Sequence, residues 1–248
     1  MRKVLGYILS PLHYLAFYLC LLIFHPIQWL SLRLGGYTAH KRTVDILNFF
    51  LVGTYYLVGS APRFINKSDL PINRSIIFVA NHQSMFDVPA MIWFLRKYHA
   101  KFVSKIELTK GIPSVSFNLK YGGGANIDRK DSKQAIVELL KFGSRMKENT
   151  WSAMIFPEGT RTKTGRMKPF VAGGVATLLK KVPDALVVPI AIRGSWELTK
   201  YGAYPLNFGH GITFTVLEEI EPAGKSAEEV VNAAELKIRA ALNETGVV

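Results

Sequence analysis

Two long apolar segments dominate the hydrophobic pattern near the amino end of the chain. Residues 4–32 contain no Lys, Arg, Asp or Glu over 29 positions, and residues 46–62 form a second uncharged run of 17. Pro11 and Pro26 leave only 14 residues between them, fewer than the roughly 20 that an untilted helix needs to cross the hydrocarbon of a bilayer. We therefore predict two apolar helices that enter one leaflet as a hairpin.

The connection between these helices is basic, because it contains Arg33, Lys41 and Arg42, which we expect near lipid phosphates. Aromatic residues expected near the membrane interface are Trp29, Tyr37, Tyr55 and Tyr56. Two other interpretations remain open: a true span over residues 4–24 that tolerates Pro11, and a secretory signal, although no small-x-small cleavage site follows. We predict a monotopic, membrane-anchoring hairpin over residues 1–62, with the rest of the chain on the cytoplasmic face.

Beyond residue 62 the pattern changes to short β-branched runs that alternate with amphipathic segments. The expected strands are 76–80, 101–104, 125–127, 153–156, 186–192 and 212–217, and the expected helices are 88–98, 131–148, 170–182 and 226–243. Two of the helices have capping signals, Asp131 before Gln134 and Ser226 before Glu229. The pattern predicts an α/β domain over residues 63–248, with a central mixed sheet flanked by helices.

Charge narrows the choice of partners. The 248 residues include 31 Lys and Arg against 18 Asp and Glu, a formal net charge of +13. Nucleic acid, anionic lipid and phosphorylated substrates all fit such a charge. We do not expect nucleic acid, because the basic residues show no interleaved aromatic stacking positions and no recognition helix. The single Cys20 excludes an internal disulfide framework and a Cys-rich zinc site.

The first candidate for chemistry is the sequence Asn-His-Gln-Ser-Met-Phe-Asp at 81–87, directly after an expected strand. Ligands of α/β sheets bind beyond the carboxyl ends of strands. A spacing of five does not align two residues on one helix face, so His82 and Asp87 would bridge a loop and a helix start. Asp87 would then accept from one imidazole nitrogen while the other serves as a base. The alternative is that Asp87 or Ser84 only caps the helix.

A second polar loop, Phe-Pro-Glu-Gly-Thr-Arg at 156–161, follows another expected strand. Gly159 permits close backbone approach, and the planar fork of Arg161 suits a phosphate group. Further cations make this loop electropositive: Lys163, Arg166 and Lys168. The alternative is a solvated loop in which Glu158 pairs with a neighbouring base.

Three further positions are weaker candidates. Lys105 follows the strand at 101–104, and Arg129 follows three consecutive glycines that would form either a phosphate nest or a simple turn. Pro189 interrupts an apolar run that reads as a core strand, with the proline at an edge or a bulge. No second His or carboxylate stands at ligand spacing near His82, so we expect no metal.

The sequence contains no Gly-x-Ser-x-Gly elbow and no Walker loop, and Cys20 lies in the apolar segment. These observations disfavour an acyl-enzyme hydrolase, a P-loop nucleotidase and a Cys-dependent transferase. What remains is a single candidate base, with cations suited to phosphate beside it, in a chain tied to a bilayer. Direct transfer of a group to a lipid hydroxyl fits this combination.

Four sequence blocks, taken in order, resemble the motifs of the lysophosphatidic acid acyltransferase family, the 1-acyl-sn-glycerol-3-phosphate acyltransferases of the glycerolipid acyltransferase superfamily. The blocks are NHQSMFD at 81–87, GGANIDR at 123–129, FPEGTR at 156–161 and VVPIAI at 187–192. The resemblance covers about residues 76–193. It implies transfer of a fatty acyl group from acyl-CoA or acyl-carrier protein to the sn-2 hydroxyl of lysophosphatidic acid, giving phosphatidic acid.

The resemblance also implies roles for individual residues. His82 would be the general base, oriented by Asp87, and attack on the thioester would be direct, with no metal and no cofactor beyond the thioester co-substrate. The acceptor phosphate would be bound by Arg161 in a loop shaped by Glu158 and Gly159, with Lys105 and Arg129 as further contacts. Pro189 would serve donor binding or structure. Other acceptors, such as glycerol-3-phosphate or a different lysophospholipid, and a non-catalytic basic membrane-surface protein, remain alternatives.

Overall fold

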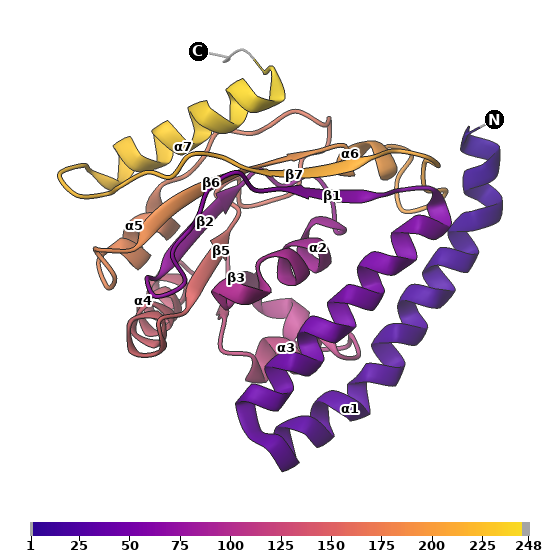
Figure 1. Ribbon diagram of the computed structural model, residues 1–248, viewed down its shortest axis with the longest axis horizontal. Coiled ribbons are helices and arrows are strands. Elements are labelled where there is room, and N and C mark those ends of the chain that lie inside the picture. Colours follow the sequence, from indigo (N-terminus) through magenta and orange to yellow (C-terminus); the bar gives the residue numbers. More distant parts are fainter. Residues whose placement is uncertain (1, 245–248) are drawn as a thin grey trace.

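Seven strands form one sheet in the order β1-β7-β6-β2-β5-β3-β4. A computed structural model describes residues 2–244 of the chain (Figure 1). The strands are β1 Pro62–Ile65, β2 Ile76–Ala80, β3 Ala100–Lys105, β4 Ala125–Ile127, β5 Ser152–Ile155, β6 Leu186–Arg193 and β7 Ile212–Val216. The predicted α/β class is confirmed, and six of these strands correspond to the six expected from the sequence.

Strand direction makes the sheet mixed, as predicted. β6, β2, β5, β3 and β4 run parallel to one another, whereas β7 is antiparallel to β6, and β1 pairs parallel with β7. β2 lies at the centre, with β6 on one side and β5 on the other. The carboxyl ends of β2, β5 and β3 therefore meet at one edge, so the loops that follow them lie close together.

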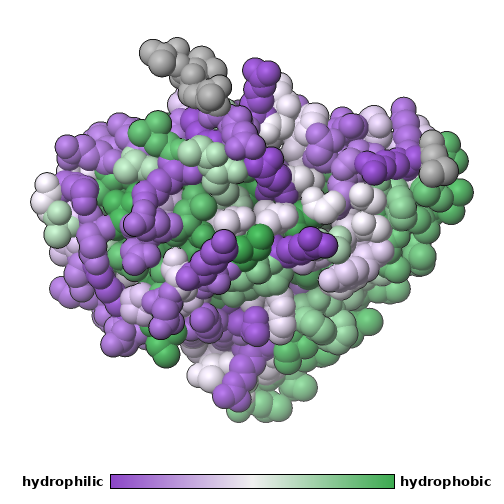
Figure 2. Space-filling model, turned by 45° about the horizontal axis from the view of Figure 1, so that its top comes forward, coloured by the Kyte–Doolittle hydropathy of each residue, from purple (hydrophilic) through white to green (hydrophobic). Residues whose placement is uncertain are grey.

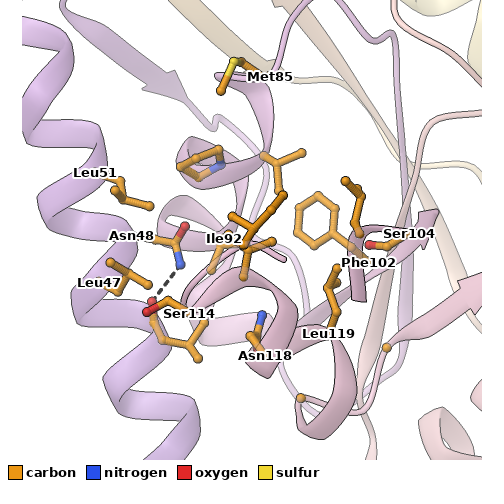
Figure 3. Close-up of a pocket in the computed structure, with 18 of the residues that line it drawn as sticks. Leu47, Asn48, Leu51, Met85, Ile92, Phe102, Ser104, Ser114, Asn118 and Leu119 are labelled. Carbon is orange, nitrogen blue, oxygen red and sulfur yellow. Dashed lines mark hydrogen bonds between the residues drawn. The ribbon is translucent and has the colours of Figure 1, made fainter. Parts of the chain in front are cut away.

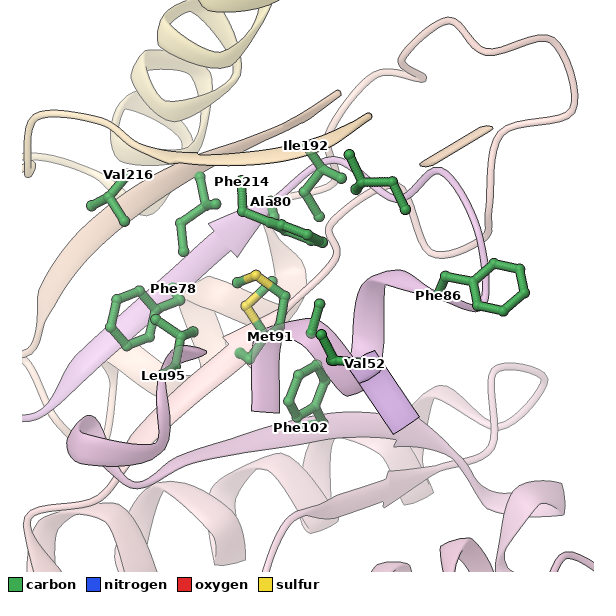
Figure 4. Close-up of a cluster of buried hydrophobic side chains, with 14 of the residues drawn as sticks. Val52, Phe78, Ala80, Phe86, Met91, Leu95, Phe102, Ile192, Phe214 and Val216 are labelled. Atoms are coloured by element: carbon green, nitrogen blue, oxygen red, sulfur yellow. The ribbon is translucent and has the colours of Figure 1, made fainter. Parts of the chain in front are cut away.

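The two faces of the sheet carry separate hydrophobic cores. Along β2, Phe78 and Ala80 face one core, while Ile77 and Val79 face the other, as the alternation of a strand requires. The first core contains α2 (Asp87–Phe94) and is shown in Figure 4. The second lies under α4 (Ser132–Asn149), α5 (Gly173–Leu179) and α7 (Ala227–Leu242). Helices thus cover both faces of the sheet.

Both predicted helix caps are present. The Asp131 side chain accepts a hydrogen bond from the backbone N–H of Gln134 over 3.0 Å, and Ser226 and Glu229 form a complete capping box. Shorter helical elements complete the fold. They are α3 (Val115–Tyr121), α6 (Ser195–Leu198) and the 3₁₀ turns η1 (Thr54–Val58), η2 (Arg96–Tyr98) and η3 (Ile106–Thr109).

The predicted hairpin is present as α1 (Arg2–Gly53), whose two arms fold back on each other at Gly36 (Figure 1). Gly36 has φ 65° and ψ −162°, a backbone conformation that glycine adopts at little cost. The expected interruption at the prolines is wrong, because the first arm continues through both Pro11 and Pro26. Proline at 11 removes the N–H that would bond the carbonyl of Tyr7, and the Tyr204 hydroxyl donates to that oxygen over 2.9 Å instead.

One side of α1 packs on the α/β part of the molecule. The Ser10 hydroxyl accepts from the backbone N–H of Leu206 over 2.8 Å, and Leu21, Leu47 and Leu51 form a small buried cluster between the arms. The other side exposes large apolar side chains, among them Ile8, Leu15, Leu22, Ile23, Leu30, Leu34, Phe49 and Phe50. Figure 2 shows apolar residues gathered along the side of the molecule where α1 lies. By length and composition, the helical segment from Arg2 to Val58 is sufficient to cross a membrane.

Candidate active site

The loop between β2 and α2 holds His82 and Asp87 together. His82 Nδ1 lies 2.8 Å from Asp87 Oδ2, and the same oxygen accepts the backbone N–H groups of Gln83 and Ser84 over 2.7 and 2.9 Å. Asp87 is fully buried and is the first residue of α2, so the predicted bridge between a loop and a helix start is present. Asp87 does not cap the helix, because the cap position is Phe86. The carboxylate instead fixes the loop and one nitrogen of the imidazole.

The His82 ring is held from a second side by Phe156, which follows β5. The two rings stack with centroids 4.0 Å apart and an angle of 13° between their planes. The His82 side chain is 13% exposed and lines a large cavity. With Nδ1 bonded to Asp87, Nε2 is the nitrogen that remains for a substrate.

Glu158 connects the loop after β5 to the loop after β2. Its Oε1 accepts the backbone N–H of His82 over 2.8 Å, and its Oε2 accepts the backbone N–H of Lys168 over 3.1 Å. The backbone N–H of Thr162 in turn donates to the His82 carbonyl over 2.9 Å. Burial raises the pKa of Glu158 to about 7, although both N–H donors favour its charged form. Glu158 therefore positions two backbone segments, and the alternative interpretation, a solvated loop in which Glu158 pairs with a neighbouring base, does not describe its contacts.

Gly159 shapes the turn that leads to Arg161. It has φ 70°, a left-handed conformation that favours glycine, and its N–H donates to the Phe156 carbonyl over 3.0 Å. A Cβ at this position would meet no atom of the described residues within 4 Å. The left-handed turn, and not close packing against protein, is what requires glycine here.

A cavity of about 1000 Å³ brings four of the predicted residues together, namely His82, Lys105, Arg129 and Arg161. Arg129 and Arg161 are exposed, and Lys105 forms a 2.8 Å ion pair with Glu107 in which both side chains are about half exposed. The base and three cations therefore border the same space. The arrangement suits a ligand with one hydroxyl near His82 and an anionic group near the guanidinium and ammonium groups.

Most of the cavity wall is apolar, and the sequence analysis did not find it. α1, α2, α3 and β3 supply this wall (Figure 3). Its apolar members include Phe17, Leu21, Leu47, Leu51, Val88, Ile92, Phe102 and Leu119. The sequence analysis interpreted the hairpin residues as lipid-facing, because composition does not distinguish the face of each arm that packs on protein from the face that is exposed.

Pro189 is not part of this site. It is buried in β6, pairs with Val79 of β2 and does not line the cavity. The expected edge position is wrong, since β6 lies inside the sheet between β7 and β2. The Pro189 carbonyl accepts the N–H of Leu217 over 2.9 Å, just beyond the last paired residues of β7. The proline, which lacks an N–H, therefore lies where the hydrogen bonds between β6 and β7 end.

Two of the three glycines before β4 pack closely against neighbouring segments of the protein. A Cβ on Gly123 would lie 2.6 Å from the Trp151 ring, and one on Gly124 would lie 2.6 Å from the Phe102 carbonyl. Arg145 donates to the carbonyls of both glycines over 3.1 and 3.0 Å. These contacts favour the turn interpretation over a phosphate nest. Residues 2–244 contain no group of three or more His, Cys, Asp or Glu side chains able to hold a metal ion.

Comparison with known proteins identifies the family of the chain. A family model described as Acyltransferase matches residues 61–193, more than half of the chain, and the protein belongs to that family. The matched segment contains the first six strands in chain order, β1 to β6, and every residue of the predicted site.

Curated relatives specify the branch that the chain resembles. It is 29% identical over 178 residues to the chloroplastic 1-acyl-sn-glycerol-3-phosphate acyltransferase BAT2 of Brassica napus, covering 71% of this chain and 48% of the relative. It is 28% identical over 200 residues to the human 1-acyl-sn-glycerol-3-phosphate acyltransferase beta, covering 80% and 69%. The chain thus spans about half the length of most of the curated relatives that it matches.

Among solved structures, the crystal structure of the 1-acyl-sn-glycerophosphate (LPA) acyltransferase PlsC from Thermotoga maritima matches with a TM-score of 0.76. The match covers 100% of both chains at 22% sequence identity. The two proteins therefore share a fold that includes the N-terminal helical segment.

Proposed function

We propose that the protein is a 1-acylglycerol-3-phosphate O-acyltransferase. It transfers a fatty acyl group from acyl-CoA or acyl-carrier protein to the sn-2 hydroxyl of lysophosphatidic acid and forms phosphatidic acid for phospholipid biosynthesis. The observation that carries the proposal is the His82–Asp87 pair, which borders a cavity that also contains Arg161. The names of the relatives, which specify 1-acyl-sn-glycerol-3-phosphate, support the choice of acceptor.

His82 acts as the general base of this reaction. Asp87 keeps the proton on Nδ1, so Nε2 accepts the proton of the sn-2 hydroxyl while the hydroxyl oxygen attacks the carbonyl carbon of the thioester. The C–S bond then breaks, and the leaving thiolate takes the proton from the imidazolium. The buried Asp87 carboxylate stabilises the imidazolium between these two steps.

Direct transfer, without an acyl-enzyme, fits the surroundings of His82. Within residues 2–244, Asp87 is the only side chain that is hydrogen-bonded to the ring. The nearby Ser84 hydroxyl pairs with Ser195 and accepts the backbone N–H of Phe86, so it is not activated by the imidazole. This scheme requires neither a metal nor a cofactor other than the thioester co-substrate.

The acceptor phosphate binds at the cationic rim of the cavity. Arg161 offers a bidentate contact, and Lys105 and Arg129, which line the same cavity, add positive charge. Glu158 and Gly159 hold the loop that carries Arg161. Pro189 has only a structural role in the sheet.

The α1 hairpin supports a site at the membrane surface. Its inner side forms part of the cavity wall and its outer side is apolar and exposed, which suits a site whose lipid substrates come from a bilayer. We propose a monotopic arrangement on the cytoplasmic face, with residues 1–62 as the anchor and 63–248 as the acyltransferase domain.

A panel of donors and acceptors tests the proposed function. Purified protein in detergent is given acyl-CoA or acyl-carrier protein, together with lysophosphatidic acid, glycerol-3-phosphate or other lysophospholipids, and the products are identified by mass spectrometry. We expect phosphatidic acid only when lysophosphatidic acid is present. Transfer to glycerol-3-phosphate alone would reassign the acceptor, and no transfer with any pair would leave a membrane-surface binding protein.

His82→Ala provides the sharpest test of mechanism. Loss of a general base lowers the rate by about 10²–10⁴-fold. The matched control is His210→Ala, since His210 is bonded to Asn207 and does not line the cavity. We expect the control to retain the parent rate and both variants to retain the parent circular dichroism spectrum. Parent-like transfer by His82→Ala would refute the assigned base.

A further inference from the structure

The cavity begins at the edge of the sheet where the carboxyl ends of β2, β3 and β5 meet, which is called the catalytic edge below. From there it extends toward the turn of the α1 hairpin. Along β3, Lys105 lies at the catalytic edge, and Lys101 lies four residues earlier, or about 13 Å away. Along α1, Phe17 contacts Phe86 of the loop between β2 and α2. Gln28 follows eleven residues later along the helix, or about 16 Å away. Figure 3 shows Leu51, Asn48 and Leu47 following one another along the same wall.

The wall between these two ends is largely apolar, and two of its polar side chains donate hydrogen bonds to backbone carbonyls of the hairpin. Asn48 donates to the Val44 carbonyl over 2.7 Å, and the Ser114 hydroxyl donates to the Leu21 carbonyl over 2.7 Å. Such internal bonds leave a surface that suits a hydrocarbon chain.

Gln28 differs from these residues. It lines the cavity and is fully buried, yet neither its Oε1 nor its Nε2 has a hydrogen-bond partner anywhere in residues 2–244. A buried amide without partners is costly, so a ligand or water that supplies them is expected at this position.

Lys101 adds a second unpaired polar group to the same end. Its ammonium forms no ion pair with a carboxylate of the described residues and lies 5.1 Å and 5.5 Å from the ring centroids of Tyr37 and Trp151. Burial and the charge of Lys41 lower the pKa of Lys101 to about 7. The neighbouring Asp45 carboxylate is occupied by Lys41 Nζ at 2.5 Å. The far end of the cavity is thus polar, while its walls are apolar.

We propose that the far end of the cavity binds a hydroxyl group near the end of an acyl chain, and that Gln28 recognises it. This proposal rests on the proposed acyl transfer, which brings such chains to the cavity. A hydroxyl both donates and accepts, so it satisfies Oε1 and Nε2 of Gln28 together, whereas a methyl end satisfies neither. A carboxylate would pair with the Lys101 ammonium and with Nε2 of Gln28, but it would leave Oε1 of Gln28 without a donor. The hydroxylated chain belongs either to the thioester donor or to the lysophospholipid.

The test compares plain and ω-hydroxylated chains of matched lengths on the full-length protein. In one arm the thioester donor carries the hydroxyl, and in the other the lysophosphatidic acid carries it. For each length, the measured quantity is the ratio of kcat/KM for the hydroxylated chain to kcat/KM for the plain chain. We expect a ratio above one at the length that reaches Gln28, in the arm whose chain enters the cavity.

Gln28→Met removes both polar atoms at nearly constant length. We expect it to lower that ratio by at least about tenfold, because a site built to bond a hydroxyl discriminates strongly. Leu21→Met is the matched control, since Leu21 is a buried cavity residue on the same helix seven residues earlier, and it should leave the ratio unchanged. Gln28→Met should fold, because the amide loses no protein partner; its unfolding temperature checks this.

An unchanged ratio in Gln28→Met, in both arms, overturns the proposal and leaves the amide bonded to water. If the parent transfers no acyl group at all, the proposed function fails while this inference stays testable by binding. Displacement of a fluorescent fatty acid by ω-hydroxylated and plain fatty acids then replaces the rate. The proposal is also overturned if the ω-hydroxylated and plain fatty acids displace the probe equally well, or if Gln28→Met shows the same preference as the parent.

Discussion

Glu158 accepts the backbone N–H of His82 over 2.8 Å and so links the loops that follow two neighbouring parallel strands. Its other oxygen accepts the N–H of Lys168, which holds the far side of the same cationic loop. One buried carboxylate therefore sets the position of the base and of the loop that presents Arg161. This explains why a site assembled from two loops needs an acidic residue that does not line the cavity.

The raised pKa of Glu158 predicts a specific effect of pH on stability. Its folded-state pKa of about 7 lies above the ordinary value of 4.5, so the folded protein binds a proton more tightly than the unfolded chain. The stabilising contribution is complete below about pH 4.5 and is lost as the pH rises through about 7. The slope from this one group is at most about 1.4 kcal/mol per pH unit.

Glu158→Gln isolates this effect, since it removes the titrating group and keeps the shape. Denaturant unfolding at several pH values should show that the parent loses stability relative to the variant between about pH 4.5 and 7. Other groups titrate in the same range, but their contributions cancel when the free energy of unfolding of the variant is subtracted from that of the parent. Parallel curves for the two proteins would mean that Glu158 does not titrate there. The variant should also transfer acyl groups more slowly, because the NH₂ group that replaces one carboxylate oxygen cannot accept the N–H which that oxygen accepted.

Arg161 is expected to act on acceptor binding rather than on donor binding. Its side chain is exposed at the cavity and belongs to the loop that Glu158 fixes. A charge-assisted hydrogen bond contributes about 1.5–3 kcal/mol, so Arg161→Ala should raise the KM for lysophosphatidic acid by about tenfold or more. The KM for the thioester should change little.

Lys163→Ala is the matched control for Arg161→Ala. Lys163 is an exposed cation of the same loop, but it does not line the cavity. It should leave both KM values near those of the parent, whereas Arg161→Lys should recover only part of the loss, because an ammonium lacks the planar fork. Equal effects of Arg161→Ala and Lys163→Ala would indicate general surface charge in place of a phosphate site.

Sequence pattern and spacing predicted the main features of the α/β part. The strand at 76–80 and the polar loop after it placed His82 at the sheet edge, and the spacing to Asp87 required a bridge into a helix start. β1 was missed because it has four residues and starts with Pro62. Its place in the sheet comes from pairing with β7, a contact across about 150 residues of sequence that no local pattern encodes.

The cavity was harder to predict than the catalytic pair. Phe17, Leu21 and Leu47 lie in long uncharged runs that are mostly apolar, so composition did not assign a buried side and an exposed side. The continuity of the first arm at Pro11 was also hidden, because the hydroxyl that bonds the released carbonyl belongs to Tyr204, nearly two hundred residues later. Both features depend on tertiary contacts between the hairpin and the rest of the chain.

The contact between the hairpin and the α/β part gives the last prediction. A Cβ on Gly6 would lie 2.1 Å from the Leu206 carbonyl oxygen, a backbone atom that cannot rotate away. Gly6→Ala must therefore separate the first arm from this segment, where the Ser10 hydroxyl also accepts the N–H of Leu206. Overpacking of this kind costs about 1–3 kcal/mol. We expect a lower unfolding temperature for Gly6→Ala.

Gly53→Ala is the matched control, since Gly53 lies at the end of the second arm with no atom within 4 Å of its Cβ position. Its backbone is helical, with φ −56° and ψ −33°, so alanine should stabilise the protein by about 0.5–1 kcal/mol. Opposite shifts of the two variants in thermal unfolding would establish that the hairpin is docked as described. A neutral Gly6→Ala would show instead that the first arm stands away from Leu206 in solution. The cavity wall formed by that arm would then have to be reconsidered.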